Sequence, residues 1–128
     1  MEVASESGGD AMEVEALSWM GVRVSDLDAS RAFFELLGLE HRHSEGEMIA
    51  FAAKNGDTVE AFGPGDEEHR HFDSGPVVGF QVDDVEAARR ELQSAGVEFA
   101  GPTERGGGMT WAHFRGPDGV LFELTGRD

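Results

Sequence analysis

The chain has no cysteine among its 128 residues. This absence excludes a disulfide framework, zinc sites built from thiolates and catalysis by a cysteine nucleophile. The chain also has no apolar run near the roughly 20 residues of a membrane span, and its N-terminus lacks the basic and apolar regions of a secretory signal. We therefore expect a protein without membrane segments, located in the cytoplasm.

Basic residues are scarce as well. Ten Lys and Arg, with Lys54 as the single lysine, are opposed by 26 Asp and Glu, and the formal net charge is −16. A surface of this sign repels the phosphate backbone of nucleic acids and attracts cationic partners. We therefore expect no nucleic-acid partner, and an acidic surface of this kind most often serves solubility.

What the chain does contain is an internal duplication. Residues 1–15 mix acidic residues with Ser and Gly without hydrophobic periodicity, so we predict a flexible acidic N-terminal tail there. Residues 16–128 have the size and composition of a single domain. Within it, residues 21–40 align without a gap on residues 79–98, and this constant offset indicates two repeated units of about residues 16–63 and 75–126.

Each repeat begins with a strand and continues into a helix. The runs LSWMGVRV and VVGFQV are rich in β-branched residues, and the following SDLDAS and DDVEAA supply Asp residues that suit helix N-caps. Gly38 and Gly96 fit the ends of these helices. Three strand-like runs follow each helix: LEHRHS, EMIAFAA and DTVEAF in the first unit, and VEFA, MTWAHF and GVLFEL in the second.

This order predicts an α+β fold. Two tandem βαβββ units should form a curved mixed sheet around a concave cavity, with the helices on the outer face. A ferredoxin-like fold is the alternative, but its copies are βαβ and would leave two strands of this chain without a place.

The repeats resemble the vicinal oxygen chelate superfamily. The motifs that carry the resemblance are VSDLDASRAFFELLGL, VDDVEAARRELQSAGV and FRGPDGVLFEL, and it covers roughly residues 16–126. That superfamily includes glyoxalase I, extradiol dioxygenases, fosfomycin-resistance enzymes and bleomycin-binding resistance proteins. The resemblance implies the fold and a homodimer, but it leaves the reaction open because one fold serves many activities.

Strand alternation indicates which side chains line the concave face. Glu60 and Glu123 interrupt apolar runs on the last strands of the two units, which are equivalent positions. His113 shares a face with Met109 and Trp111, so His113 and Glu123 are the candidate catalytic residues. The predicted ligand-binding residues are Trp19, Arg23, Glu60, Phe62, Val77, Gln81, Met109, Trp111 and Glu123.

The resemblance also implies a metal site, and two of its positions have changed. Metal-dependent members take ligands from the first and last strands of each unit, typically His or Gln on the first and Glu on the last. The Glu positions match Glu60 and Glu123, whereas the His positions fall on Trp19 and Val77, which cannot donate a lone pair to a divalent cation. We therefore expect no cofactor. The alternative is a divalent metal (Zn, Ni, Mn or Fe) held by Glu60 and Glu123.

The other histidines occur as two pairs. Each pair has i, i+2 spacing, which on a strand would let both rings bind one metal, but solvated loop and edge positions are far commoner. The pairs are His41 with His43, and His69 with His71.

Two acidic groups on one face require a partner. At about 4 Å, two carboxylates repel by about 4 kcal/mol at an effective dielectric near 20. Distance, a shared proton, an ion pair with Arg23 or a cationic ligand would relieve this repulsion. We therefore favour a small-molecule binding protein without the usual transition-metal site, of the kind that sequesters a cationic or amphipathic drug in antibiotic resistance. The alternative is a divergent metal-dependent lyase, isomerase or dioxygenase that uses Glu60, Glu123 and His113.

Overall fold

A computed structural model describes residues 12–128, so most of the predicted acidic tail lies outside the described residues. The first unit consists of β1 (Ala16–Arg23), α1 (Leu27–Leu36), β2 (Glu40–Glu45), β3 (Met48–Ala52) and β4 (Thr58–Phe62). The second consists of β5 (Val77–Gln81), α2 (Val85–Ser94), β6 (Glu98–Phe99), β7 (Glu104–Gly106), β8 (Met109–Arg115) and β9 (Leu121–Arg127). The short strand β7 is an addition to the predicted βαβββ order, and it pairs with β8.

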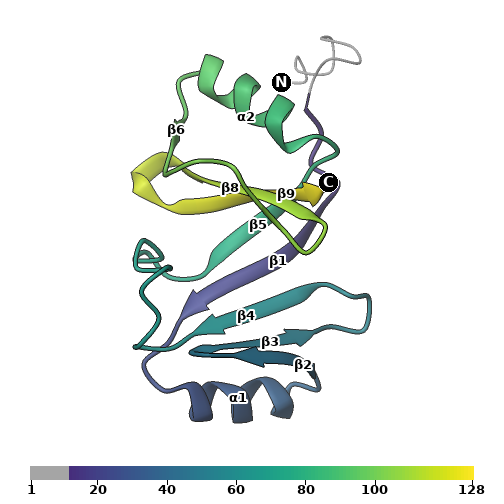
Figure 1. Ribbon diagram of the computed structural model, residues 1–128, viewed down its shortest axis with the longest axis vertical. Helices are drawn as coiled ribbons and strands as arrows, with labels where there is room; N and C mark the ends of the chain where they lie inside the picture. Colours follow the sequence, from purple (N-terminus) through teal and green to yellow (C-terminus); the bar gives the residue numbers. More distant parts are fainter. Residues whose placement is uncertain (1–11) are drawn as a thin grey trace.

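The strands form a single mixed sheet in the order β2-β3-β4-β1-β5-β9-β8-β6. The first strands of the two units, β1 and β5, are antiparallel neighbours, and each last strand, β4 or β9, runs parallel to the first strand of its own unit. Figure 1 shows α1 and α2 at opposite ends of the molecule, with β1 and β5 crossing between them. The predicted fold is confirmed, and the ferredoxin-like alternative is excluded.

The two helices begin and end in the same way. Asp26 and Asp84 are the N-caps. The side chain of each accepts a hydrogen bond from the backbone N–H of the residue three positions later. Gly38 and Gly96 follow the last turns with φ of 89° and 95°, a region in which a side chain is strained. The residues after them donate back to Phe34 and Leu92, so both helices close with the same hydrogen-bond motif.

Three apolar clusters hold the sheet and the helices together. Two lie under the helices: Phe34, Ile49, Phe51 and Ala61 under α1, and Val82, Val85, Ala88, Ala112, Phe114 and Leu124 under α2. The third lies on the other face of the sheet and contains Phe62, Phe72, Val77 and Leu121. Because Phe72 belongs to the connector between the units, this cluster joins that connector to the central strands.

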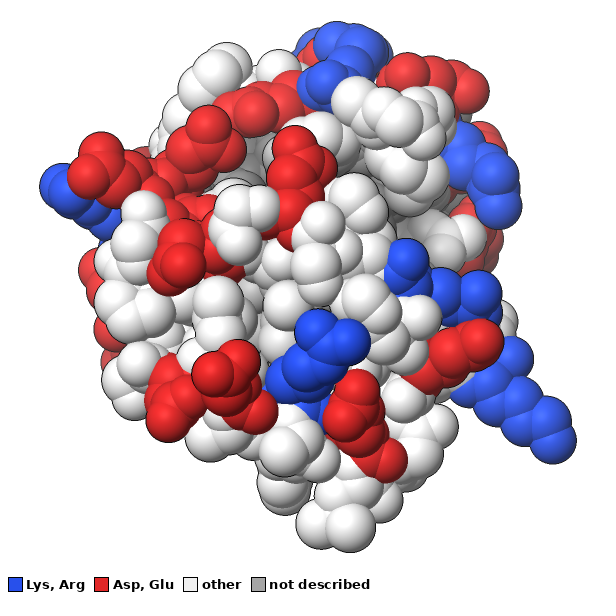
Figure 2. Space-filling model, turned by 60° about the horizontal axis from the view of Figure 1, so that its bottom comes forward, with Lys and Arg blue, Asp and Glu red and all other residues white. Residues whose placement is uncertain are grey.

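The charged residues lie around these clusters. Figure 2 shows Asp and Glu spread over the face that it presents, with fewer Lys and Arg among them. Within residues 12–128, neither helix is long and apolar enough to cross a membrane.

The α1 cluster gives a stability prediction. Phe51 is 0% exposed, whereas Phe33 is 55% exposed on the same end of the molecule. We expect Phe51→Ala to lower the free energy of unfolding by about 3–5 kcal/mol, because it removes a fully buried ring and leaves a cavity. Phe33→Ala is the matched control and should change it by less than about 0.5 kcal/mol. Urea unfolding measures both, and equal losses would contradict the assignment of the core.

Candidate functional site

A cavity of about 690 Å³ opens on the face of the sheet opposite the helices. Strands of both units and the connector between them line it within one chain, and its volume suits a drug-sized molecule. Seven of the residues predicted from the sequence line it: Trp19, Glu60, Gln81, Met109, Trp111, His113 and Glu123. Gly106 and Gly107 form part of its rim.

Trp19 covers the centre of the sheet because two glycines make room for it. Its partner on the neighbouring strand β5 is Gly79, and a Cβ on Gly79 would lie 3.1 Å from the Trp19 Cβ. A Cβ on Gly21 would lie 2.2 Å from the Trp19 Cη2, well inside van der Waals contact. The indole Nε1–H donates a hydrogen bond of 3.2 Å to Oε1 of Glu60. The indole therefore fills the space between the two central strands and holds the first of the two glutamates.

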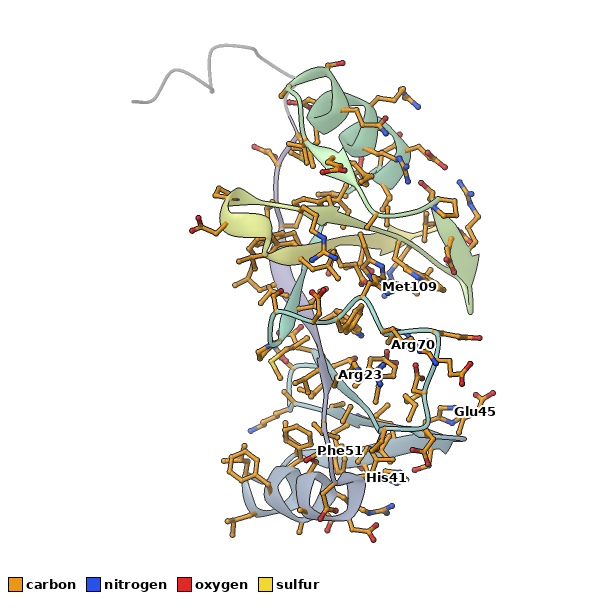
Figure 3. All side chains as sticks on the ribbon, turned by 90° about the vertical axis from the view of Figure 1, so that its left-hand side faces the viewer. Arg23, His41, Glu45, Phe51, Arg70 and Met109 are labelled. Carbon is orange, nitrogen blue, oxygen red and sulfur yellow. The ribbon has the colours of Figure 1, made fainter. Side chains whose placement is uncertain are left out.

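The connector covers the other half of this face. A Cβ on Gly21 would also lie 2.8 Å from the ring of Phe72, which meets Trp19 edge-on at a centroid distance of 6.1 Å. Beneath Phe72, Val77 is 0% exposed. Figure 3 shows the connector, with Arg70 labelled, between Met109 of the second unit and Arg23 of the first.

Three predicted ligand-binding residues are therefore absent from the cavity wall. Val77 and Phe62 are buried in the third cluster, and the Arg23 guanidinium donates to the carbonyl oxygen of Asp66 in the connector. Strand alternation correctly assigned Val77 and Phe62 to the face opposite the helices. It could not show that residues 64–76 fold over this part of the face.

Two connector histidines belong to the site rather than to a solvated loop. His71 Nε2 lies 3.1 Å from Nδ1 of His113, and His113 Nε2 lies 2.8 Å from Oε1 of Glu123. His69 lines the cavity, stacks on Phe62 at a centroid distance of 3.7 Å and contacts the carboxylate of Asp66. The three groups Glu123, His113 and His71 thus form one hydrogen-bonded series.

His41 and His43 lie far from this series on β2. His41 contacts Ser44, and exposed His43 contacts Glu45. These contacts agree with the edge position that we expected for this pair.

The buried acid and base are both uncharged at neutral pH. Burial raises the pKa of Glu123 to about 8, and the negative charge of Glu60 adds to this effect. Burial lowers the pKa of His113 to about 4. The protonated carboxyl of Glu123 therefore donates to Nε2 of His113, and Nδ1–H of His113 donates to His71, an assignment that follows from the hydrogen-bond pattern. A proton on Glu123, and not an ion pair with Arg23, relieves the repulsion between the two glutamates.

The residues present do not fit a transition metal at this position. Metal sites of this kind need several N or O donors that converge on one point. Within residues 12–128, no group of three or more His, Asp or Glu side chains is placed to hold a metal ion. The Trp19 indole lies over the two central strands, and its N–H engages the Oε1 of Glu60. An indole N–H is a donor only and cannot replace an imidazole ligand.

Sequence comparison then assigns the family. Residues 16–124 match the Glyoxalase/Bleomycin resistance protein/Dioxygenase superfamily. The chain belongs to this superfamily. No curated protein sequence matches it significantly.

Solved structures of the superfamily show the same fold. The chain is similar to methylmalonyl-CoA epimerase from Mycobacterium tuberculosis, with a TM-score of 0.71 and 25% identity over 90% of this chain and 89% of that one. It is similar to the Mn(II)-bound glyoxalase from Novosphingobium aromaticivorans, with a TM-score of 0.69 and 23% identity over 90% of this chain and 40% of that one. It is also similar to a mutant of homoprotocatechuate 2,3-dioxygenase from Brevibacterium fuscum, with a TM-score of 0.70 and 15% identity over 91% of this chain and 33% of that one.

Several lining residues had no clear signal in the sequence. They come from the β3–β4 turn, the connector and the end of β9, and include Asn55, Asp57, His69, Phe72 and Arg127. In the connector, the i, i+2 spacing of His69 and His71 was the sequence feature that pointed to a site. On a strand this spacing would place both rings on one face, but the chain forms no strand there. Turn and connector residues reach the cavity only because the sheet curves around it.

The shifted pKa of Glu123 predicts how stability changes with pH. Its folded pKa of about 8 lies above its usual 4.5, so this group stabilises the fold fully below pH 4.5 and loses that contribution as pH rises through 8. His113 acts in the opposite sense, because its folded pKa of about 4 lies below its usual 6.5 and its contribution is lost as pH falls. Below pH 6.5 the two groups change the free energy of unfolding in opposite directions. Between about pH 6.5 and 8 only Glu123 titrates of the two, so the free energy of unfolding falls there.

We therefore expect the free energy of unfolding to fall by about 2 kcal/mol across that window, since one pKa unit corresponds to about 1.4 kcal/mol. Glu123→Gln should remove the fall, because a carboxamide does not titrate. Exposed Glu98→Gln is the control and should keep it. Urea unfolding at three pH values in the window measures this. An equally steep fall in the Glu123 variant would show that another group titrates.

Proposed function

We propose that the protein binds an amphipathic small molecule with a positively charged group in the cavity, without a transition metal. The observation that carries the proposal is Glu60. Its carboxylate lines the cavity, and within the described residues its hydrogen-bond partner is the neutral Trp19 N–H rather than a basic side chain. Asp57 and Glu123 are the other acidic residues of the wall, against one Arg, Arg127. A cationic group would therefore be attracted into the cavity.

The apolar part of such a ligand has surfaces to contact. Trp19 forms the floor, and Trp111 lies against Gly106, whose Cβ position is 3.3 Å from the Trp111 Cη2. Met109 on the same strand supplies a flexible apolar side chain. Indole faces bind both planar rings and cations, so the two tryptophans and Glu60 together favour an aromatic or amphipathic cation.

Membership of a superfamily that includes bleomycin resistance proteins supports a specific form of this function. We propose that the protein sequesters cationic drug-like molecules, acts in the cytoplasm and assembles as a homodimer. Strands of both units of one chain line the cavity.

A binding experiment tests the role of Glu60. Calorimetric titration with metal-free bleomycin and with ethidium, a planar aromatic cation, should give saturable heat. We expect Glu60→Gln to weaken binding at least about 5-fold, which is roughly 1 kcal/mol, because the shape is kept while the charge is lost. Glu67→Gln on the exposed part of the connector is the matched control and should bind like the wild type. No heat with either cation, or unchanged binding by the Glu60 variant, would contradict the proposal.

The alternative is a divergent metal-dependent enzyme that uses Glu60, Glu123 and His113, and the similarity to a Mn(II)-bound glyoxalase supports it. Elemental analysis of protein purified without chelator separates the two. We expect far less than one equivalent of Zn, Ni, Mn or Fe per chain, because the indole of Trp19 stands where a ligand would be required. One equivalent of any of these metals, lost in Glu123→Gln and kept in Glu98→Gln, would favour the enzyme instead.

A further inference from the structure

We propose that the ligand of the cavity is a zwitterion, whose cationic group lies beside Glu60 and whose anionic group is bound by Arg127. The inference rests on the proposed function, because a cationic molecule must first enter this cavity. It goes beyond that function by adding a second group of opposite charge to the ligand, together with a binding site for it. The ligand class becomes an aromatic or amphipathic molecule that carries both a positive and a negative group.

The charged side chains of the cavity wall are divided between the two units. Glu60 on β4 and Asp57 in the β3–β4 turn bring their carboxylates from the first unit. Arg127, at the end of β9, comes from the second unit, and among residues 12–128 it is the one Lys or Arg that lines the cavity. Burial raises the pKa of Glu123 to about 8, so this carboxyl adds little charge at neutral pH. The first unit therefore gives the cavity a negative wall, and the second gives it a positive end.

Strand register places Glu60 and Arg127 at different ends of the cavity. Through β1, Glu60 is level with Val77 at the start of β5. The last residue of β5, Gln81, pairs with Thr125 of β9, and Arg127 lies two residues further along that strand. Four residues of β5, about 13 Å at 3.3 Å per residue, therefore separate the two levels. A ligand that contacts both ends must be extended, with its two charges well separated.

Arg127 lies on the face of the sheet that forms the cavity. Its partner across the β8–β9 ladder is Met109, and the next pair on the same face is Trp111 with Thr125. All four residues line the cavity. Arg127 is exposed, so its guanidinium can exchange water for an anionic group. That group would lie beside the apolar side chains of Met109 and Trp111, which contact the body of the ligand.

Neighbouring arginines of the second unit already have acidic partners. Arg105 contacts Glu86, and Arg115 contacts Asp73. Within residues 12–128, no Asp or Glu forms an ion pair with Arg127. A guanidinium binds a carboxylate or phosphate through two parallel hydrogen bonds, which gives it a geometric preference for such groups. Arg127 is therefore the arginine of this wall that can take an anion from the ligand.

The duplication shows that this anion site belongs to one unit. When the two last strands are aligned on their glutamates, Arg127 corresponds to Pro64. The strand β4 ends at Phe62, before that position, whereas β9 continues to Arg127. The longer last strand of the second unit thus brings a basic side chain to the wall. The fold itself does not require one there.

The probe for the anion site is tetramethylrhodamine, a planar aromatic cation that also carries a carboxylate. Its methyl ester is the matched cation without the negative charge. Fluorescence anisotropy titrations at one salt concentration give both dissociation constants. We expect the zwitterion to bind at least about 5-fold more tightly, because its carboxylate pairs with the guanidinium. The net charge of −16 attracts the ester more strongly, so overall charge would give the opposite order.

Variants separate the two ends of the ligand. Arg127→Gln should weaken tetramethylrhodamine and bring the ratio of the two dissociation constants to about 1. Arg90→Gln removes the same charge from an exposed position of α2, on the other face of the sheet, and should keep the wild-type ratio. Glu60→Gln should weaken both probes, because both carry the cationic group. Circular dichroism and urea unfolding confirm that each variant is folded.

The outcomes distinguish this inference from the proposed binding function. Equal affinity for the two probes, or a wild-type ratio in folded Arg127→Gln, overturns the zwitterion and leaves cation binding at Glu60 intact. Failure of both rhodamines to bind to a protein that binds ethidium has the same meaning. Binding of both rhodamines that Glu60→Gln leaves unchanged overturns the cation-binding function, and the inference with it.

Discussion

The contact of the Trp19 indole with Gly21 and Gly79 determines the chemistry of the whole cavity. The indole occupies the middle of the two central strands, where a histidine at position 19 would have offered a lone pair instead. Its N–H donates to Glu60, and its ring lies over Gly79 next to Glu123, which is 5% exposed. Because Glu123 is buried and lies near Glu60, its pKa is raised to about 8, and this carboxyl stays protonated at neutral pH. With Glu60 and Asp57 on its wall, such a cavity attracts positive charge.

The two units therefore differ in the partners of their glutamates while they keep the same order of strands and helix. Their helix caps, their strand order and their last-strand glutamates are repeated. Their acids are not equivalent, since Glu60 contacts an indole and Glu123 contacts an imidazole. The first contact supports the proposed binding of a cation, and the second holds the buried carboxyl of Glu123 by a hydrogen bond. A single cavity between the units brings both together.

Much of the site could be predicted by counting along strands. In an extended strand alternate residues share a face, so the positions of Trp19, Glu60, Trp111, His113 and Glu123 followed from the sequence and the duplication. The same rule placed Val77 and Phe62 on the face opposite the helices, where both are buried in the third cluster. Alternation assigns a residue to a face of the sheet, but it does not show whether another segment of the chain covers that face. Contacts with Phe72 and Asp66 arise from a connector whose path has no periodicity.

The sequence by itself determined the duplication, the elements of each unit, the superfamily and the identities of the two mirrored acids, because local propensity and periodicity encode all of these. The tertiary structure decided the protonation of Glu123 and the partners of His113, His69 and His71. Burial, the distance between charges and the path of the connector depend on residues far apart in the chain. No pattern along the sequence records which side chains will share a cavity, and the pKa of a buried carboxyl depends on those neighbours.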